Sequence, residues 1–181
     1  TLQDFVAIGL TARVPMVLLV HPAQPFKTIK ELVGYARANA GKLNYGSAGV
    51  GSAMYLVAES FKTMAAIDLV QIAYKGGGPA LIELAGGQLP MTFISLVAGM
   101  PLVQGGRARA LGVSSLKPHP SFPDVPAIAE SGVPGFEFYL WQGMIGPAAL
   151  PRAVVTRLNS EINNALADPQ VKERMMQAGN E

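Results

Sequence analysis

The chain has 181 residues, of which 50% are hydrophobic and 14% are charged, so we expect a folded protein with a large buried core rather than a disordered one. The formal net charge is +2 and the basic residues are scattered, which argues against nucleic acid as a partner. The absence of cysteine excludes disulfides and cysteine-bound metals, and the longest aliphatic run, Met16 to Val20, is too short to span a bilayer.

Short apolar runs alternate with helical patterns through the first 113 residues. A helix is predicted from Thr28, because Thr28 and Glu31 have the spacing of a capping box. Strands are predicted over residues 5–10, 16–20, 43–45, 69–73, 89–94 and 108–113, and further helices begin at Ser52, at Pro79 and at residue 96. This alternation predicts an α/β fold with a mostly parallel sheet flanked by helices.

The pattern changes after residue 117. Four prolines between residues 117 and 126 indicate an extended surface connection. A short helix over 127–131, a strand over 136–145 and two helices over 151–167 and 169–178 are predicted to follow. We place a boundary between two lobes near residues 138–146.

Two glycine-rich turns stand out, each between a predicted strand and a predicted helix. The first glycine turn, residues 45–52, reads YGSAGVGS, and the second glycine turn, residues 74–80, reads YKGGGPA. The start of a helix offers unpaired N–H groups and a partial positive charge, so it can hold a small anion without a basic side chain. Ser47 and Ser52 could add hydroxyl donors. Taken locally, both segments are equally compatible with ordinary tight turns.

Simple energetics show that no arginine is required for such a site. A hydrogen bond to a charged group contributes about 1.5–3 kcal/mol. Four such bonds would supply roughly 6–12 kcal/mol before the ordering costs of binding. Micromolar affinity needs only about −8 kcal/mol. Backbone and hydroxyl donors are therefore sufficient to hold a small carboxylate.

The sequence contains no set of residues that indicates catalysis. His21 and His119 are far apart and no second ligand lies at metal-binding spacing. No G-x-S-x-G motif is present, and the first glycine turn matches neither nucleotide fingerprint. We therefore expect no catalytic residues, no metal and no cofactor. Trp141, the only tryptophan, is either a packing residue at the lobe junction or a wall of a ligand cleft.

Several motifs occur in an order that is specific when they are taken together. They are residues 43–52 (LNYGSAGVGS), 74–80 (YKGGGPA), 122–126 (FPDVP), 130–135 (ESGVPG), 141–143 (WQG) and 159–169 (NSEINNALADP). With these motifs the chain resembles, over essentially its whole length, the Bug/TctC family of substrate-binding receptors of tripartite tricarboxylate transporters.

This resemblance implies a non-catalytic periplasmic binding protein of type II fold. Such a protein closes its two lobes on a small organic carboxylate and delivers it to membrane transporter subunits, without spanning the membrane itself. Residues 12–140 would form a nearly complete second lobe. Residues 1–11 and 141–181 would form part of the first lobe, with hinges near residues 12 and 140, and the N-terminal part of that lobe would be missing.

The resemblance also implies which residues bind the ligand. The family's two ligand loops fall on Ser47, Gly49, Gly51 and Ser52 in the first glycine turn and on Gly76, Gly77, Pro79 and Ala80 in the second, and we add Trp141 as a cleft wall. Two positions depart from the family pattern: Tyr55 stands where histidine is frequent, and Ile94-Ser95 follows the Phe93 strand where a polar residue is frequent. The resemblance therefore implies a ligand class and not a particular ligand.

Two other classes of function are left open by the residues. A ligand-sensing effector domain of a transcription regulator can share the bilobal fold, and a DNA-binding helix-turn-helix encoded upstream of Thr1 would indicate it, whereas a signal peptide there would exclude it. An α/β enzyme would need a nucleophile, a base or a metal beside the glycine turns. Only serines are present there.

Overall fold

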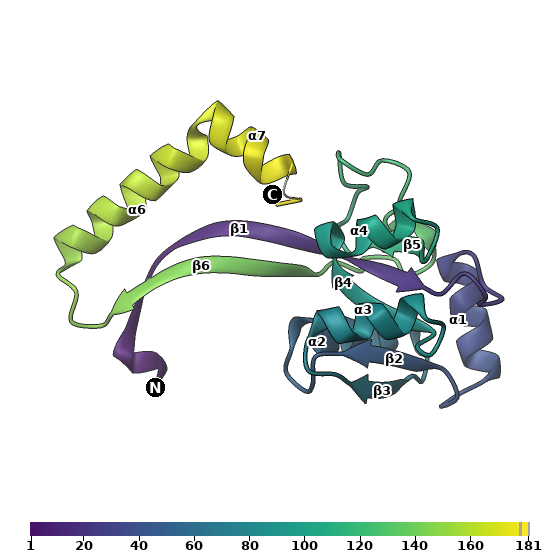
Figure 1. Ribbon diagram of the computed structural model, residues 1–181. Coiled ribbons are helices and arrows are strands. Elements are labelled where there is room, and N and C mark those ends of the chain that lie inside the picture. The colour runs from purple at the N-terminus through teal and green to yellow at the C-terminus, as the bar shows by residue number, and fades with distance from the viewer. Residues whose placement is uncertain (178, 181) are drawn as a thin grey trace. The chain divides into compact units, whose positions relative to one another are not determined.

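The computed structural model describes residues 1–177, 179 and 180 (Figure 1). The last residue of the helix predicted over 169–178 therefore lies outside the described residues. The chain forms two compact units. Unit 1 consists of Thr1–Val14 and Leu140–Glu181, and unit 2 is the continuous segment Pro15–Tyr139.

Unit 2 is built on a mixed sheet of strands in the order β3-β2-β4-β1-β5. Its elements are β1 (Phe5–Val20, which begins in unit 1), α1 (Ile29–Ala38), β2 (Asn44–Ser47), α2 (Ala53–Ala65), β3 (Val70–Ala73), α3 (Gly77–Ala85), β4 (Met91–Ser95), α4 (Leu96–Gln104), β5 (Arg109–Val113) and α5 (Ile128–Ser131). β2 runs parallel to both β3 and β4, whereas β1 is antiparallel to β4 and β5. The predicted α/β class is confirmed, and β1 is the exception to the predicted parallel order.

β1 is a single strand, although the sequence predicts separate strands over residues 5–10 and 16–20. Its second half occupies the centre of the sheet, where Val17 pairs with Ile94 on one side and with Val113 on the other. The side chains of Met16 to Val20 are at most 2% exposed. A strand covered on both faces needs apolar residues at every position, and this explains the continuous run of Met, Val and Leu.

Helices cover both faces of this sheet. The ring of Phe61 in α2 lies 5.6 Å from the ring of Phe93 in β4 and 5.7 Å from that of Phe136, at interplanar angles of 63° and 84°. On α4, a Cβ built at Gly99 would lie 2.8 Å from Cγ2 of Ile94. Since consecutive strand residues point to opposite faces, α2 and α4 lie on opposite sides of β4.

Local capping sets the predicted helix start at Thr28. The Thr28 hydroxyl accepts a hydrogen bond from the Glu31 backbone N–H at 3.2 Å. The Glu31 carboxylate accepts from the backbone N–H of Lys27 at 2.7 Å, one residue before the position that a capping box uses. The two bonds still satisfy donors at this helix end, so α1 begins where the sequence predicts.

Ser114 joins the two chain segments that lead out of unit 2. Its side-chain oxygen accepts from the Met16 N–H at 2.8 Å and donates to the carbonyl of Phe138. Its backbone N–H donates to the Met16 carbonyl at 2.8 Å, and its own carbonyl accepts from the Phe138 N–H at 2.9 Å. The residue is fully buried, so one serine fixes both segments beside the end of β5.

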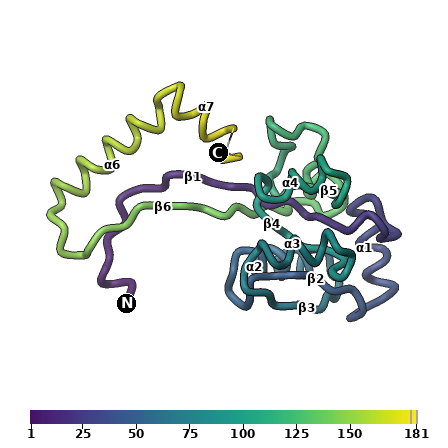
Figure 2. Tube along the Cα trace, viewed as in Figure 1, coloured from purple at the N-terminus to yellow at the C-terminus, as the bar shows by residue number. Residues whose placement is uncertain are grey.

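Unit 1 contains the 3-10 turn η1 (Leu2–Asp4), the first part of β1, the paired strand β6 (Tyr139–Pro147), α6 (Arg152–Ala167) and α7 (Pro169–Gln177). Figure 2 follows β1 and β6 side by side. Asn159 of α6 donates to the Ile8 carbonyl at 2.7 Å, which ties the helix to β1. In the described part of the chain, α6 and α7 bury no residue, and no helix is both long and apolar enough to cross a membrane.

Candidate functional site

The two glycine turns lie side by side at one edge of the sheet. β3, β2 and β4 are parallel neighbours, so the turns that follow their carboxyl ends share this edge. The Tyr74 N–H donates to the Ser47 carbonyl at 2.8 Å, which bonds the second turn to the first. A Cβ built at Gly77 would lie 3.7 Å from the sulfur of Met54, the second residue of α2. The starts of α2 and α3 are therefore neighbours.

The first glycine turn is closed by its own hydrogen bonds. The Gly49 N–H donates to the Ser47 hydroxyl oxygen at 3.1 Å, and the Ser52 hydroxyl donates to the Gly49 carbonyl at 2.7 Å. The Ser52 oxygen also accepts from the Tyr55 N–H at 3.2 Å and so caps α2. Ser47 is fully buried. Both hydroxyls thus hold the turn, and their direct donation to a ligand stays a prediction.

The remaining donors of the first glycine turn belong to the backbone. Ala53 and Met54 are the first two residues of α2, and their N–H groups have no acceptor within the helix. Gly49 has a φ of 99°, and a Cβ there would meet open space. The turn therefore presents bare backbone, together with exposed Gly51, to its surroundings.

The second glycine turn has no side-chain cap. Gly76 is the N-cap of α3 with φ 122° and ψ 177°, a conformation that side-chain-bearing residues avoid. The helix begins at Gly77 rather than at the predicted Pro79, which occupies its third position. Gly77 and Gly78 thus supply the first N–H groups of α3, and Gly78 is exposed with open space at its Cβ position.

Ala80 does not share this exposure. Its side chain is fully buried, and its Cβ lies 3.5 Å from the position that a Cβ on Gly46 would take. Ala80 therefore packs α3 onto β2. Its predicted contact with a ligand is untested and would have to be made through the backbone.

A third helix start completes this edge of the sheet. Ser95 ends β4 and is the N-cap of α4. Among the described residues its half-buried hydroxyl has no hydrogen-bond partner. Ser95 was not among the predicted donors, because no glycine marks this turn. The available signal was a serine at the single position between the strand predicted over residues 89–94 and the helix predicted from residue 96.

Trp141 lies in β6, in unit 1, whereas the other eight predicted site residues lie in unit 2. Its side chain is 69% exposed. This exposure leaves the indole available to a ligand or to another surface, so its role as a cleft wall stays a prediction.

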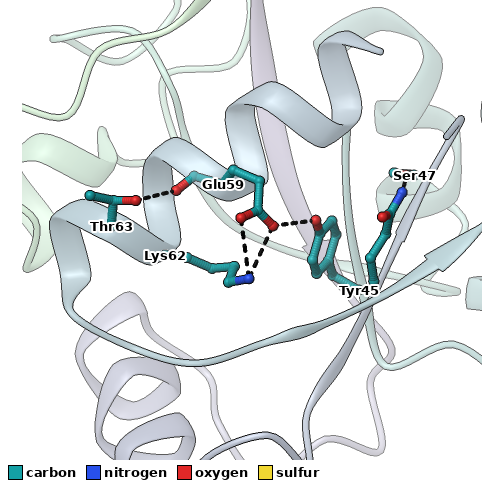
Figure 3. A network of polar contacts seen from close by, with 6 residues as sticks. Tyr45, Ser47, Glu59, Lys62 and Thr63 are labelled. Atoms are coloured by element: carbon teal, nitrogen blue, oxygen red, sulfur yellow. Dashed lines mark hydrogen bonds and ion pairs between the residues drawn. The ribbon is translucent and has the colours of Figure 1, made fainter. Parts of the chain in front are cut away.

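A polar network anchors α2 to β2 behind the first glycine turn (Figure 3). The Tyr45 hydroxyl donates to a carboxylate oxygen of Glu59 at 2.6 Å, and Lys62 donates to the same oxygen at 3.0 Å. Burial raises the pKa of Glu59, but the hydrogen bonds from Tyr45 and Lys62 outweigh it and hold that pKa below its ordinary value. Burial and the bond to Glu59 raise the pKa of Tyr45. Glu59 is therefore ionised at neutral pH and serves the fold.

The two glycine turns contain a single charged side chain. Lys75 is the only charged residue in either glycine turn, and it is exposed. No group of three or more histidine, aspartate or glutamate side chains within residues 1–177, 179 and 180 is placed to hold a metal ion. The arrangement can thus attract an anion through Lys75 and hold it through backbone donors.

Comparison with known proteins identifies the family. The model for the tripartite tricarboxylate transporter family receptor, TctC, matches residues 1–181. The chain belongs to this family. A protein of Pseudomonas sp. strain P51 from the tcbD-tcbE intergenic region is 42% identical over 178 residues, and the match covers 98% of this chain and 53% of that protein. BugT of Bordetella pertussis is 29% identical, with 98% and 55% covered.

Solved structures agree with this assignment. Rpa4515 of R. palustris with adipate superposes with a TM-score of 0.88 at 35% identity, over 98% of this chain and 60% of that one. The periplasmic binding protein BugD gives 0.83 at 37% identity, with 98% and 59% covered. MatC from Rhodopseudomonas palustris with bound malate gives 0.84 at 29% identity, with 98% and 60% covered. The chain spans about half the length of the curated relatives and about 60% of the length of these structures.

The family is a receptor family and not an enzyme class. The match gives no support to the alternative of a transcription-regulator domain.

Proposed function

We propose that this chain is the ligand-holding part of an extracytoplasmic solute receptor. It binds one carboxylate of a small organic acid at the shared edge of β3, β2 and β4. The donors are the first N–H groups of α2 and α3, with the glycines of both turns allowing close approach, and Ser95 adds a hydroxyl. Ser47 and Ser52 keep the first glycine turn in shape, and Trp141 remains a proposed ligand contact.

The observation that carries this proposal is the set of adjacent helix starts. The first residues of α2, α3 and α4 follow parallel neighbouring strands, and each helix start has N–H groups without an intrahelical acceptor. The partial positive charge at each of these helix starts favours an anion at this edge of the sheet. No basic side chain has to be buried, so the site avoids the cost of desolvating a charged residue.

Related structures indicate the ligand class. Rpa4515 was solved with adipate and MatC with malate, and both ligands are dicarboxylates. One carboxylate would occupy the helix starts in unit 2. We therefore infer a small dicarboxylate as the ligand of this receptor.

Calorimetric titration tests the binding site. Adipate and malate should bind with a Kd near the micromolar range, which corresponds to about −8 kcal/mol. Hexane-1,6-diol, which has the length of adipate without its charges, should not bind. Ser95→Ala should weaken adipate binding by about 1–3 kcal/mol if its hydroxyl meets the carboxylate. A protein that binds neither dicarboxylate, nor any other small carboxylate, contradicts the proposal.

The single tryptophan gives an independent measurement. If Trp141 contacts the ligand, its fluorescence should change in intensity or wavelength with the same midpoint as the calorimetric titration. Trp141→Phe should then lower adipate affinity. Unchanged fluorescence at saturating adipate would remove Trp141 from the site.

The location and partners of the receptor are part of the proposal. BugD is a periplasmic binding protein, and the family is named for tripartite transporters. We therefore propose a periplasmic receptor that docks on the membrane subunits of such a transporter. Fractionation of cells that express the encoded protein, followed by cross-linking to the membrane subunits, tests both points. Recovery in the cytoplasm alone would contradict them.

A further inference from the structure

Within the described structure, two side chains outside the first glycine turn hydrogen-bond to side chains of that turn. Glu59 bonds to Tyr45, and Gln71 bonds to Ser47. It lies in β3, opposite Tyr45 in the parallel pairing with β2, and its side-chain nitrogen donates to the Ser47 hydroxyl oxygen at 2.7 Å. Residues that pair across neighbouring strands share a face of the sheet, and Ser47 is two residues beyond Tyr45 on that face. Gln71 therefore reaches along the sheet to the base of the turn.

Ser47 relays this contact to the backbone that turns toward the helix starts. Its oxygen accepts from Gln71 and from the Gly49 N–H at 3.1 Å, and the residue is fully buried. A serine hydroxyl can rotate about its side-chain bond, and a second donor from a fixed strand restrains that rotation. Gly49 in turn receives the Ser52 hydroxyl on its carbonyl at 2.7 Å. The chain of bonds thus runs from β3 through Ser47 and Gly49 to the N-cap of α2.

We propose that Gln71 is a positioning residue for the carboxylate site, acting through Ser47 and Gly49 to hold the first glycine turn in its binding conformation. This inference rests on the proposed function. Gln71 need not touch the ligand. It fixes a glycine-rich turn before binding, and a donor set that is already ordered binds more tightly because less freedom is lost.

Backbone amide exchange measured by NMR tests the positioning role without any ligand. Gln71→Met keeps the length of the side chain and removes its donor. The exchange of the Gly49 and Ser52 N–H groups should then become at least about fivefold faster. The Tyr74 N–H, which bonds to the Ser47 carbonyl, should change less than about twofold, since the strand pairing is untouched. Gln88→Met makes the same chemical change at an exposed glutamine and is the matched control.

Titration with adipate then tests the consequence for binding. Gln71→Met should weaken adipate binding by about three- to tenfold, and Gln88→Met should leave it unchanged. In Gln71→Glu the Ser47 hydroxyl can donate to the new carboxylate, so the exchange of Gly49 should stay near the wild-type rate. Adipate affinity should nevertheless fall, because a like charge has been placed beside the site.

Two results overturn the inference. One is a Gly49 exchange rate that Gln71→Met leaves unchanged. The other is faster exchange with unaltered adipate affinity, which would show that order in this turn does not matter for binding. If the wild-type protein binds neither adipate nor malate, the proposed function fails, and the exchange rates alone decide whether Gln71 positions the turn.

Discussion

The two glycine turns connect a strand to a helix at the same sheet edge, but different forces hold them. In the first turn, side-chain hydroxyls hold the backbone: Ser47 and Ser52 both hydrogen-bond to Gly49, and Ser52 caps α2. In the second turn, Gly76 alone makes the corner, with φ 122°, and no side chain caps α3. The first turn should therefore be sensitive to the loss of hydroxyl groups, and the second to the addition of a Cβ.

Gly76→Ala should have the largest effect on stability. At φ 122° and ψ 177° an alanine is strained, and we expect the free energy of unfolding to fall by about 2 kcal/mol. Chemical denaturation measures this change. Outside the two adjacent residues, no atom lies within 4 Å of the added Cβ, so a loss would report backbone strain rather than a clash. Wild-type stability in this variant would refute the glycine-based description of the second turn.

Ser52→Ala should have the next largest effect on stability. It removes the N-cap of α2 and the bond to the Gly49 carbonyl, and we expect a loss of about 1 kcal/mol in the free energy of unfolding. Ser52→Thr keeps the hydroxyl and is the matched control. Denaturation and adipate titration together separate two roles. Weaker binding with undiminished stability would mean that the hydroxyl serves the ligand and not the cap.

Tyr45→Phe probes the polar network behind the first turn, for which the described residues show no counterpart at the second. Removing the hydroxyl leaves Glu59 with Lys62 alone, and because Glu59 is 35% exposed we expect a loss of only about 1 kcal/mol at pH 7. The lowered pKa of Glu59 means that its contribution is fully present above its ordinary value of 4.5 and is lost as the pH falls through the lower folded value. The stabilities of the two proteins should therefore converge as the pH falls below the folded-state pKa of Glu59, and an undiminished difference in acid would exclude the ionised Glu59 as the cause.

Gly78→Ala should change stability least. Its Cβ meets open space and its φ is not in the left-handed region, so the free energy of unfolding should stay the same or rise by up to about 1 kcal/mol from better helix propensity. If a carboxylate approaches the first turn of α3, the added methyl should still weaken adipate binding by roughly tenfold. Calorimetry on this stable variant is thus a direct test of close approach. Unaltered affinity would place the ligand away from Gly78.

Much of the fold is local and can be read from the sequence. Thr28 and Ser52 cap helices through bonds to residues three positions later, and these spacings are visible in a single sequence. The place of β1 is not local. It lies antiparallel between β4 and β5, strands more than 70 residues away, so an alternation of strands and helices predicts the class but not this insertion.

The candidate site also has a local part, which the sequence predicts, and a long-range part, which it does not. The backbone donors are local, because they lie where glycines directly precede a predicted helix. The bond from Gln71 to Ser47 joins residues 24 positions apart, and the burial of Ala80 depends on how α3 sits on β2. Such contacts arise only when strands pair and helices pack, so they could not be predicted from local sequence. Both serine hydroxyls were predicted as donors to a ligand, and in the structure both form hydrogen bonds within the turn.

Ser114 has a mechanical consequence for a chain whose two units are joined by two segments. The same residue hydrogen-bonds to Met16 and to Phe138 through its side chain and its backbone. A displacement of either segment is therefore transmitted to the other segment at this point. Neither segment can slide along β5 by itself without breaking bonds to a buried serine. Ser114 thus ties the two connections together at this point, and we expect any bending of the connections to occur beyond it.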